Sequence, residues 1–331
     1  MHDALAPSVN RRPMHCLQFH LLPRRIATGI VQLVALSCFV SDAQTPGIRL
    51  SAPSLGWILA ANGSQLVEIT GLSMSPRTGR SLPLPSPGRR LWVAPDSSSA
   101  VVRLDTGLFL LRSDSSLQAL QDLTADVETV ALWDRSSAGF ALCWQSACES
   151  REANGAIRSR WDLPAGHRPL AFSLEHGLVA ANSDSALWLR LSDSTPLDAV
   201  PAAAAFRPHT IELWLLDSSG RLSGRDFQGR RTGEAQLVPN ALGLVASQDG
   251  AAFFAANAAG AAAVASLATS QTEQFAVEDS VEGVWAAPGL FAIRLHASAK
   301  RPIGFWNGET GLTGWMPAHS LAESPETEVR Q

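Results

Sequence analysis

Three short polar segments hold the side chains most able to do chemistry, and each of them follows an apolar run. Their charged and imidazole members are Asp134, Arg135, Glu175, His176, Arg207 and His209. Imidazole and carboxylate groups transfer protons near neutral pH, and Arg binds anions through charge-assisted hydrogen bonds. If the fold brings the three segments together, they fit acid–base catalysis or anion binding. A solvated polar rim would have the same composition.

The sequence contains none of the motifs that mark a specific catalytic site. It has no G-x-S-x-G nucleophile motif, no Gly-rich phosphate loop before a helix, no H-E-x-x-H and no paired C-x-x-C. A calcium loop of the D-x-D-x-D-G type is also absent. The sequence therefore predicts no catalytic residue, no metal and no cofactor.

An uncharged, mostly apolar run, Ile26–Val40, follows Arg24 and Arg25 near the N-terminus. Small residues at Ser41 and Ala43 then flank a cleavage point, which completes the three-part pattern of a signal peptide. We predict a signal peptide over residues 1–43 and a secreted or periplasmic chain that begins near Gln44. An uncleaved anchor, a lipoprotein attached at Cys38 and a start at Met14 remain alternatives.

Removal of residues 1–43 would leave two of the four cysteines, Cys143 and Cys148. If Gln145-Ser146 is a two-residue hairpin turn, the two cysteines face each other in a non-hydrogen-bonded pair, where Cβ atoms lie closest. An oxidising compartment would favour a disulfide between them. Two buried free thiols are the alternative.

Composition argues against nucleic acid as a partner. Only 17% of the 331 residues are charged, and the formal net charge is −4. Such a chain lacks the positive field that attracts phosphate backbones. After signal cleavage the chain has no remaining apolar run that would span a membrane, and we expect a monomer whose partner is a protein or a glycan.

From residue 48 onward, short apolar runs alternate with polar turn clusters, and the pattern repeats about every 40 residues. Each repeat reads as four short strands, and this is the length of one β-propeller blade. The first strand of the repeat recurs around Ala52, Val93, Trp133, Phe172, Phe206, Ala246 and Ala286.

These repeats predict an all-β fold, a β-propeller of seven four-stranded blades over residues 44–318, followed by a disordered polar tail over 319–331. Six or eight blades and a two-domain β-sandwich are the alternatives. The Ala-rich run 255–265 could form a helix by propensity, but the repeat passes through it as strands. Tryptophans recur about once per repeat, and we expect them to pack between blades. Those we assign to this role are Trp57, Trp92, Trp133, Trp144, Trp188, Trp214 and Trp285.

Two segments carry a resemblance to known proteins. Trp92–Leu104 and Leu244–Ala256 have the order apolar, small, polar, apolar that opens a propeller blade. On these segments the chain resembles WD-repeat and YVTN-type propeller proteins, although no Trp-Asp pair closes each repeat. The resemblance implies an architecture, and propellers serve unrelated functions.

Two classes of function follow. The first is an exported, non-enzymatic module that binds a protein, a glycan or a cell-surface component. The second is a propeller hydrolase, such as a lactonase-type enzyme. In a propeller the turns after the first strands gather at one end of the axial channel, so the three polar segments would converge there.

Overall fold

The computed structural model describes residues 53–72, 75–122, 127–190, 193–277 and 280–287, and three further strands within residues 292–316. All of them belong to one compact unit, Leu50–Gln331. The predicted signal peptide (1–43) and polar tail (319–331) lie outside the described residues. In the described part of the chain the regular secondary structure is β-strand, and it contains no helix that could cross a membrane.

The described strands form antiparallel sheets, each made of strands that are consecutive in the sequence. The first sheet has three strands, β1 (Ser54–Leu59), β2 (Gln65–Leu72) and β3 (Ser75–Pro83). The next two have four strands each: β4 (Gly88–Val93), β5 (Ala100–Leu104), β6 (Gly107–Leu111) and β7 (Leu117–Gln121); then β8 (Thr129–Trp133), β9 (Gly139–Trp144), β10 (Ala147–Glu152) and β11 (Ile157–Asp162).

Four more four-stranded sheets follow. The first two of them are β12 (Arg168–Ser173), β13 (Gly177–Ala181), β14 (Ala186–Leu189) and β15 (Ser194–Pro196); then β16 (Ala203–Phe206), β17 (Leu213–Leu216), β18 (Arg221–Arg225) and β19 (Arg231–Gln236). The last two are β20 (Ala241–Ala246), β21 (Ala252–Asn257), β22 (Ala261–Ser266) and β23 (Gln271–Ala276); then β24 (Gly283–Ala286), β25 (Ala292–His296), β26 (Ile303–Asn307) and β27 (Leu312–Met316).

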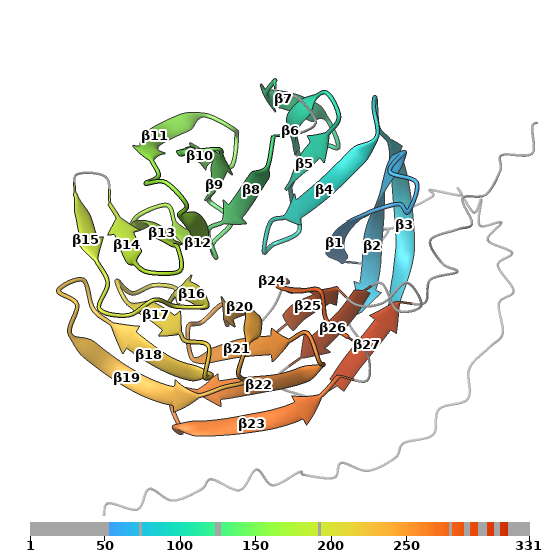
Figure 1. The fold of residues 1–331 in the computed structure, drawn as a ribbon. Helices are drawn as coiled ribbons and strands as arrows, with labels where there is room; N and C mark the ends of the chain where they lie inside the picture. The colour runs from blue at the N-terminus through green and yellow to red at the C-terminus, as the bar shows by residue number, and fades with distance from the viewer. Residues whose placement is uncertain are drawn as a thin grey trace, which may run out of the picture. The chain divides into compact units, whose positions relative to one another are not determined.

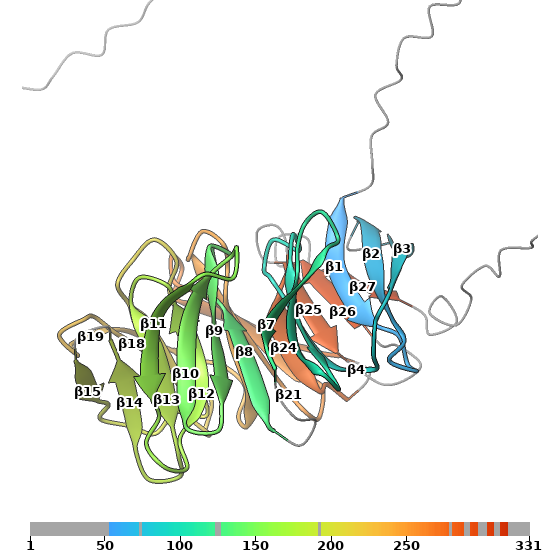
Figure 2. The same ribbon diagram turned by 90° about the horizontal axis from the view of Figure 1, so that it is seen from above.

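The first strand of each sheet lies innermost, and the sheets stand around a common axis (Figure 1). Neighbouring inner strands contact one another from β1 through β4, β8, β12, β16 and β20 to β24. Seen at right angles to that view, the inner strands run between the two faces of the ring (Figure 2). The turns before and after an inner strand therefore lie on opposite faces.

The predicted all-β propeller is confirmed. The predicted count of seven four-stranded blades is not confirmed, because only six of the described sheets have four strands and the sheet of β1 has three. Prolines disfavour a fourth strand before β4, because a proline has no N–H to donate to a β-ladder: Pro83 is the last residue of β3, and Pro85 and Pro87 follow before β4 begins.

The 40-residue repeat located the inner strands. Six of the seven predicted positions fall within inner strands, namely Val93 in β4, Trp133 in β8, Phe172 in β12, Phe206 in β16, Ala246 in β20 and Ala286 in β24. The seventh, Ala52, lies outside the described residues. The Ala-rich run 255–265 forms parts of β21 and β22, as the repeat predicts.

Apolar side chains fill the space between adjacent sheets. Trp214 of β17 packs with Phe253 of β21 at 4.9 Å between ring centroids, and both belong to a buried cluster with Leu216 and Ala263. Trp57, Trp188 and Trp214 are each 3% exposed, as expected for tryptophans that pack between blades. Trp92 and Trp133 are partly buried, and Trp133 Nε1 donates to Trp92 O at 2.9 Å across two sheets.

The hairpin of β9 and β10 has the predicted geometry. Trp144 pairs with Ala147 and Cys143 pairs with Cys148, which leaves Gln145-Ser146 as the two-residue turn. Gln145 has φ 53°, in the left-handed region that such turns use. The cysteines form a disulfide with 4.1 Å between their Cα atoms, so the predicted bridge is confirmed.

Candidate ligand-binding site

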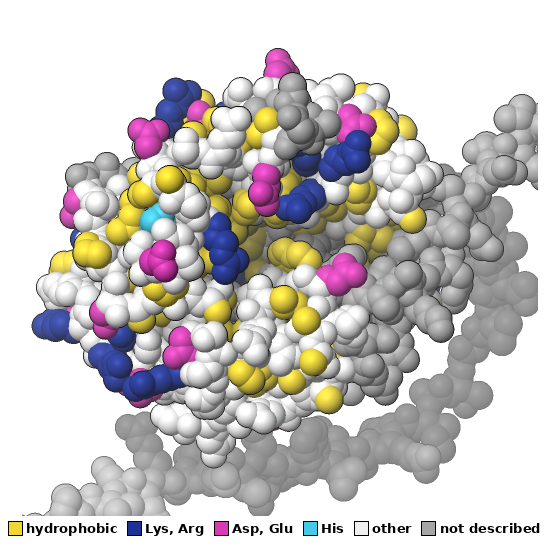
Figure 3. Space-filling model, in the orientation of Figure 1, with side chains coloured by type: hydrophobic (Ala, Val, Ile, Leu, Met, Phe, Trp, Pro, Cys, Tyr) yellow, Lys and Arg dark blue, Asp and Glu magenta, His cyan; other side chains and the backbone are white. Residues whose placement is uncertain are grey.

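The inner strands surround a cavity of about 970 Å³ at the centre of the ring. Small residues make this space, because β16 contributes Ala203, Ala204 and Ala205 to its wall. Residues at both ends of the inner strands line the cavity, from Arg168 at the start of β12 to His176 after its end. The cavity therefore extends along the axis as a channel. In Figure 3 a hollow opens at the centre of one face, with hydrophobic side chains inside it and Lys or Arg side chains at its edge.

All six residues that the sequence singled out line this channel. They lie in the turns after β8, β12 and β16, which follow inner strands of three successive sheets. We call the channel end formed by these turns the turn mouth. Its members are Asp134, Arg135, Glu175, His176, Arg207 and His209.

The Asp134 side chain connects two of the three turns that form the turn mouth. Its side chain is 9% exposed, and Oδ1 accepts a hydrogen bond from the Ser136 backbone N at 2.8 Å. Oδ2 accepts from the Leu174 backbone N of the next sheet, also at 2.8 Å. The carboxylate therefore fixes its own turn and ties two sheets together.

Arg207 also joins neighbouring sheets. Its Nε donates to the Gly250 carbonyl of the next sheet at 2.8 Å, and a terminal nitrogen pairs with Glu212 Oε2 at 2.8 Å. Glu212 Oε2 accepts a second hydrogen bond, from Trp214 Nε1 at 3.3 Å. The Arg207 side chain keeps 30% of its surface exposed, so one side of the guanidinium still faces solvent.

Glu175, His176 and His209 of the turn mouth are less constrained than Asp134 and Arg207. Glu175 and His209 are exposed, and neither side chain makes a hydrogen bond or ion pair with any residue that the structure describes. The His176 ring is half-buried and lies 6.1 Å from the Phe206 ring, centroid to centroid. These side chains are available to a partner at the surface.

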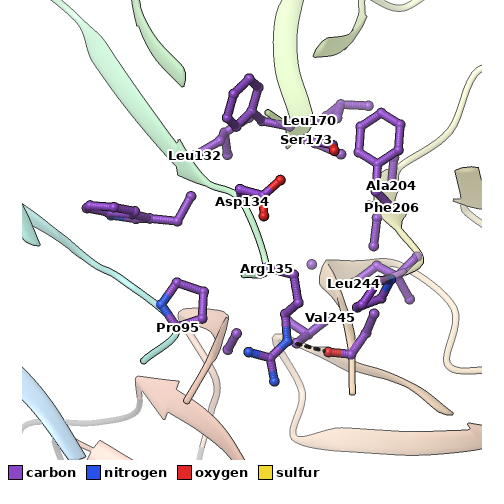
Figure 4. A pocket seen from close by; sticks show the side chains of 18 of the residues that line it. Pro95, Leu132, Asp134, Arg135, Leu170, Ser173, Ala204, Phe206, Leu244 and Val245 are labelled. Carbon is purple, nitrogen blue, oxygen red and sulfur yellow. Dashed lines mark hydrogen bonds between the residues drawn. The ribbon is translucent and has the colours of Figure 1, made fainter. Parts of the chain in front are cut away.

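Arg135 extends into the channel (Figure 4). Its Nε donates to the Ala246 carbonyl of β20 at 2.8 Å, so the side chain reaches from the sheet of β8 to that of β20. Among the described residues, no hydrogen bond or ion pair uses its two terminal nitrogens, which lie on the side of the guanidinium away from Ala246.

Burial of its guanidinium lowers the pKa of Arg135 to about 10, although the charges of Asp134 and Asp249 act in the opposite direction. Burial alone would raise the pKa of Asp249, but hydrogen bonds from Ser247 Oγ and the Ala251 backbone N hold it below its ordinary value. The positive charge at the centre of the channel is thus incompletely balanced by its surroundings.

Two parts of the site were missed in the sequence. Asp249, in the turn after β20, influences Arg135 from a sheet that the three polar segments do not include. The repeat places Asp249 in an equivalent turn, so extending the comparison of turns to that sheet could have found it. The apolar walls were also missed, because strand alternation does not show which inner side chains face the axis.

Within the described residues, no group of three or more His, Cys, Asp or Glu side chains is arranged to hold a metal ion. The arrangement at the turn mouth can instead bind an anion at Arg135 and surface groups around it.

Comparisons with known proteins show the fold. No protein-family model matches the chain, and no curated protein matches its sequence. A functionally unknown protein from Desulfotomaculum acetoxidans DSM 771 has a similar structure, with TM-score 0.59 and 10% identity over 79% of this chain and 94% of that one. The β-propeller domain of Cps50 (Swd1) from Myceliophteria thermophila matches with TM-score 0.56 and 12% identity, over 71% of this chain and 87% of that one. At these identities the likeness concerns the β-propeller architecture alone.

Proposed function

We propose that the chain is an exported, non-enzymatic binding module that holds an anionic group of a protein or glycan at the turn mouth. One observation carries the proposal: turns from three successive sheets bring two arginines and two histidines to the same end of one channel. Arg is the side chain best suited to carboxylate, sulfate and phosphate, since its guanidinium donates several hydrogen bonds in a fixed plane.

Export is part of the proposal and rests on two observations. The run Ile26–Val40 has the sequence pattern of a signal peptide, and Cys143 and Cys148 form a disulfide, as is usual in oxidising compartments. N-terminal sequencing of the mature protein should find a start near Gln44. An intact Met1 or Met14 in the mature protein would contradict this part.

The experiment measures binding of the protein to oligosaccharides with uronic acid or sulfate groups, to their neutral counterparts, and to acidic and neutral peptides. Arg207→Gln should weaken binding of an anionic partner by about tenfold, because a charged hydrogen bond contributes about 1.5–3 kcal/mol. Glu175→Gln should strengthen it a few-fold, because a repelling carboxylate is lost. Arg221→Gln is the matched control, since Arg221 is exposed on β18 and does not line the channel.

Three outcomes would overturn the proposal. Equal weakening by Arg207→Gln and Arg221→Gln would show that only net charge matters. Equal binding of anionic and neutral partners would remove the role of the arginines. Turnover of lactone or ester substrates at the channel would assign the chain to the hydrolase class.

A further inference from the structure

Around Arg135 the channel has a wall of apolar side chains. Leu132, Leu170, Ala204, Phe206, Leu244 and Val245 line the cavity around Arg135 (Figure 4). They come from β8, β12, β16 and β20, so apolar surface faces the axis from four sheets. A ligand that binds Arg135 can therefore place part of its surface against hydrocarbon.

Arg135 is held in position for a ligand. The bond from Nε to the Ala246 carbonyl fixes the plane of the guanidinium, and the terminal nitrogens form no bond to any described residue. The two nearby carboxylates do not neutralise it at close range, since no ion pair joins Arg135 to Asp134 or Asp249. The Asp249 carboxylate accepts hydrogen bonds within its own turn, and that of Asp134 accepts from its own turn and from Leu174 of the next sheet. A planar anion can accept two parallel hydrogen bonds from such a group.

We propose that the channel binds a monocarboxylate with an apolar body, the carboxylate on the terminal nitrogens of Arg135 and the body against Leu132, Leu170 and Leu244. This inference rests on the proposed function, since it uses the same channel, and it names the ligand chemistry. The burial that depresses the pKa of Arg135 supports it, because a bound carboxylate would supply the missing negative charge.

The walls distinguish this ligand from other anions. A polyhydroxylated sugar acid bound at Arg135 would place some hydroxyl groups against leucine, where they lack hydrogen-bond partners, at a cost in free energy. An inorganic anion such as sulfate would leave the apolar walls in contact with water and gain nothing from them. The volume of about 970 Å³ is ample for a ligand of eight to fifteen heavy atoms, since ligand pockets span about 300–1,000 Å³.

Two sources supply this chemistry: a free organic acid, or the C-terminal residue of a partner protein with an apolar side chain. Both end in a carboxylate on an apolar body. A free acid fits inside the channel, whereas a C-terminal residue would enter through a mouth with its chain leaving toward the partner.

The test is calorimetric titration of the full mature chain with 4-phenylbutyrate, with its amide, and with a tetrapeptide ending in leucine as the free acid or the C-terminal amide. Each acid should bind about tenfold or more tightly than its amide. Arg135→Met should remove that difference, whereas Arg221→Met should leave it unchanged. The tighter of the two acids identifies the source.

Equal binding of acid and amide by the unaltered protein, or an acid preference that survives Arg135→Met, would overturn the inference. The acid–amide comparison needs no variant, so it decides the matter even if Arg135→Met does not fold. Ala204→Phe adds a second check, because it fills the channel and should weaken 4-phenylbutyrate while sparing binding of a partner at the surface.

The two proposals can fail separately. If 4-phenylbutyrate binds at Arg135 but Arg207→Gln and Glu175→Gln change no partner's affinity, the channel inference stands and the proposed surface function falls. If anionic partners bind at the turn mouth but acids and amides bind the channel equally, the reverse holds.

Discussion

Arg135 and Arg207 are both partly buried, but their hydrogen-bond partners give them different roles. Arg207 is tied to the next sheet through Gly250 and to its own turn through Glu212, so two of its nitrogens serve the fold. Arg135 uses one donor for Ala246 and leaves its terminal nitrogens in the channel. A guanidinium with spare donors in an apolar cavity lowers stability and is retained where binding requires it.

Replacing Arg135 with methionine should therefore stabilise the protein. The folded-state pKa of Arg135, about 10, lies below its unfolded value, so the charge destabilises the fold fully below pH 10, and this effect fades as the pH rises from 10 to the unfolded pKa. Discounted for partial exposure and for the lost bond to Ala246, the free energy of unfolding should rise by about 1–2 kcal/mol at pH 7.

Urea unfolding checks this prediction, with Arg221→Met as a control that should change stability by less than about 0.5 kcal/mol. The gain should be constant between pH 6 and 9, because Arg135 stays charged throughout that range. A less stable Arg135→Met variant would mean that its contact with Ala246 outweighs the burial of charge.

For a buried ion pair in β10, removal of the arginine should destabilise the protein, in contrast to Arg135. Glu149 and Arg151 are 4% and 5% exposed, and Glu149 Oε2 accepts from Arg151 at 2.6 Å. Arg151→Met would leave the buried carboxylate with only Arg160, whose side chain is 71% exposed. Arg151→Met should lower the free energy of unfolding by about 3–5 kcal/mol.

The matched variant is Arg160→Met, which removes the exposed partner of the same carboxylate. It should lower the free energy of unfolding by no more than about 1 kcal/mol in the same denaturant titration. Similar losses for the two variants would show that burial does not control the strength of this network.

Much of the element arrangement could be predicted from the sequence, because a propeller repeats one local pattern. Around Ala246 and Phe253 the residue types and the 40-residue repeat both predict strands, and strands form there. In the Ala-rich run that follows, the repeat predicted strands against the helix propensity of alanine, and it was correct. The repeat could also place Arg135 and His209 in equivalent turns. It could not show that Arg135 reaches Ala246, because that contact joins residues 111 positions apart across the axis.

The hairpin of β9 and β10 offers a test at the scale of one element. Its disulfide joins residues five positions apart, so the loop that it closes is very short. Loop-closure entropy predicts a contribution of about 2 kcal/mol or less to the free energy of unfolding. Cys143→Ala with Cys148→Ala should fall within that limit and should leave ligand binding unchanged.

Thiol labelling of the unreduced protein provides the direct check, since no free thiol should react at these two positions. Denaturant midpoints before and after reduction should differ by an amount similar to the effect of the double alanine variant. Loss of more than about 4 kcal/mol would show that the bridge does more than restrain one hairpin.

At the scale of the whole ring, the first and last sheets meet without sharing a strand among the described residues. Contact between β3 and β27 and a buried apolar cluster hold them together. The cluster combines Leu55, Ile58, Ala60, Val67, Ile69, Ala287, Ile303 and Phe305. Among the described residues no chain connection crosses this junction, so apolar side-chain packing supplies much of its stability.

We therefore expect the ring to open first between the sheets of β1 and β24. Phe305 at this junction and Phe140 between the sheets of β4 and β8 are both fully buried, and alanine at either site should lower the free energy of unfolding by about 3–5 kcal/mol.

Hydrogen exchange should distinguish the two variants. Phe305→Ala should lose amide protection preferentially in the first and last sheets, because in the described part of the chain these sheets are held together by packing and not by a connecting segment. Phe140→Ala, whose two sheets are also joined by the chain, should lose protection across the ring together. The same exchange pattern in both variants would show that the junction is no weaker than the other contacts between sheets.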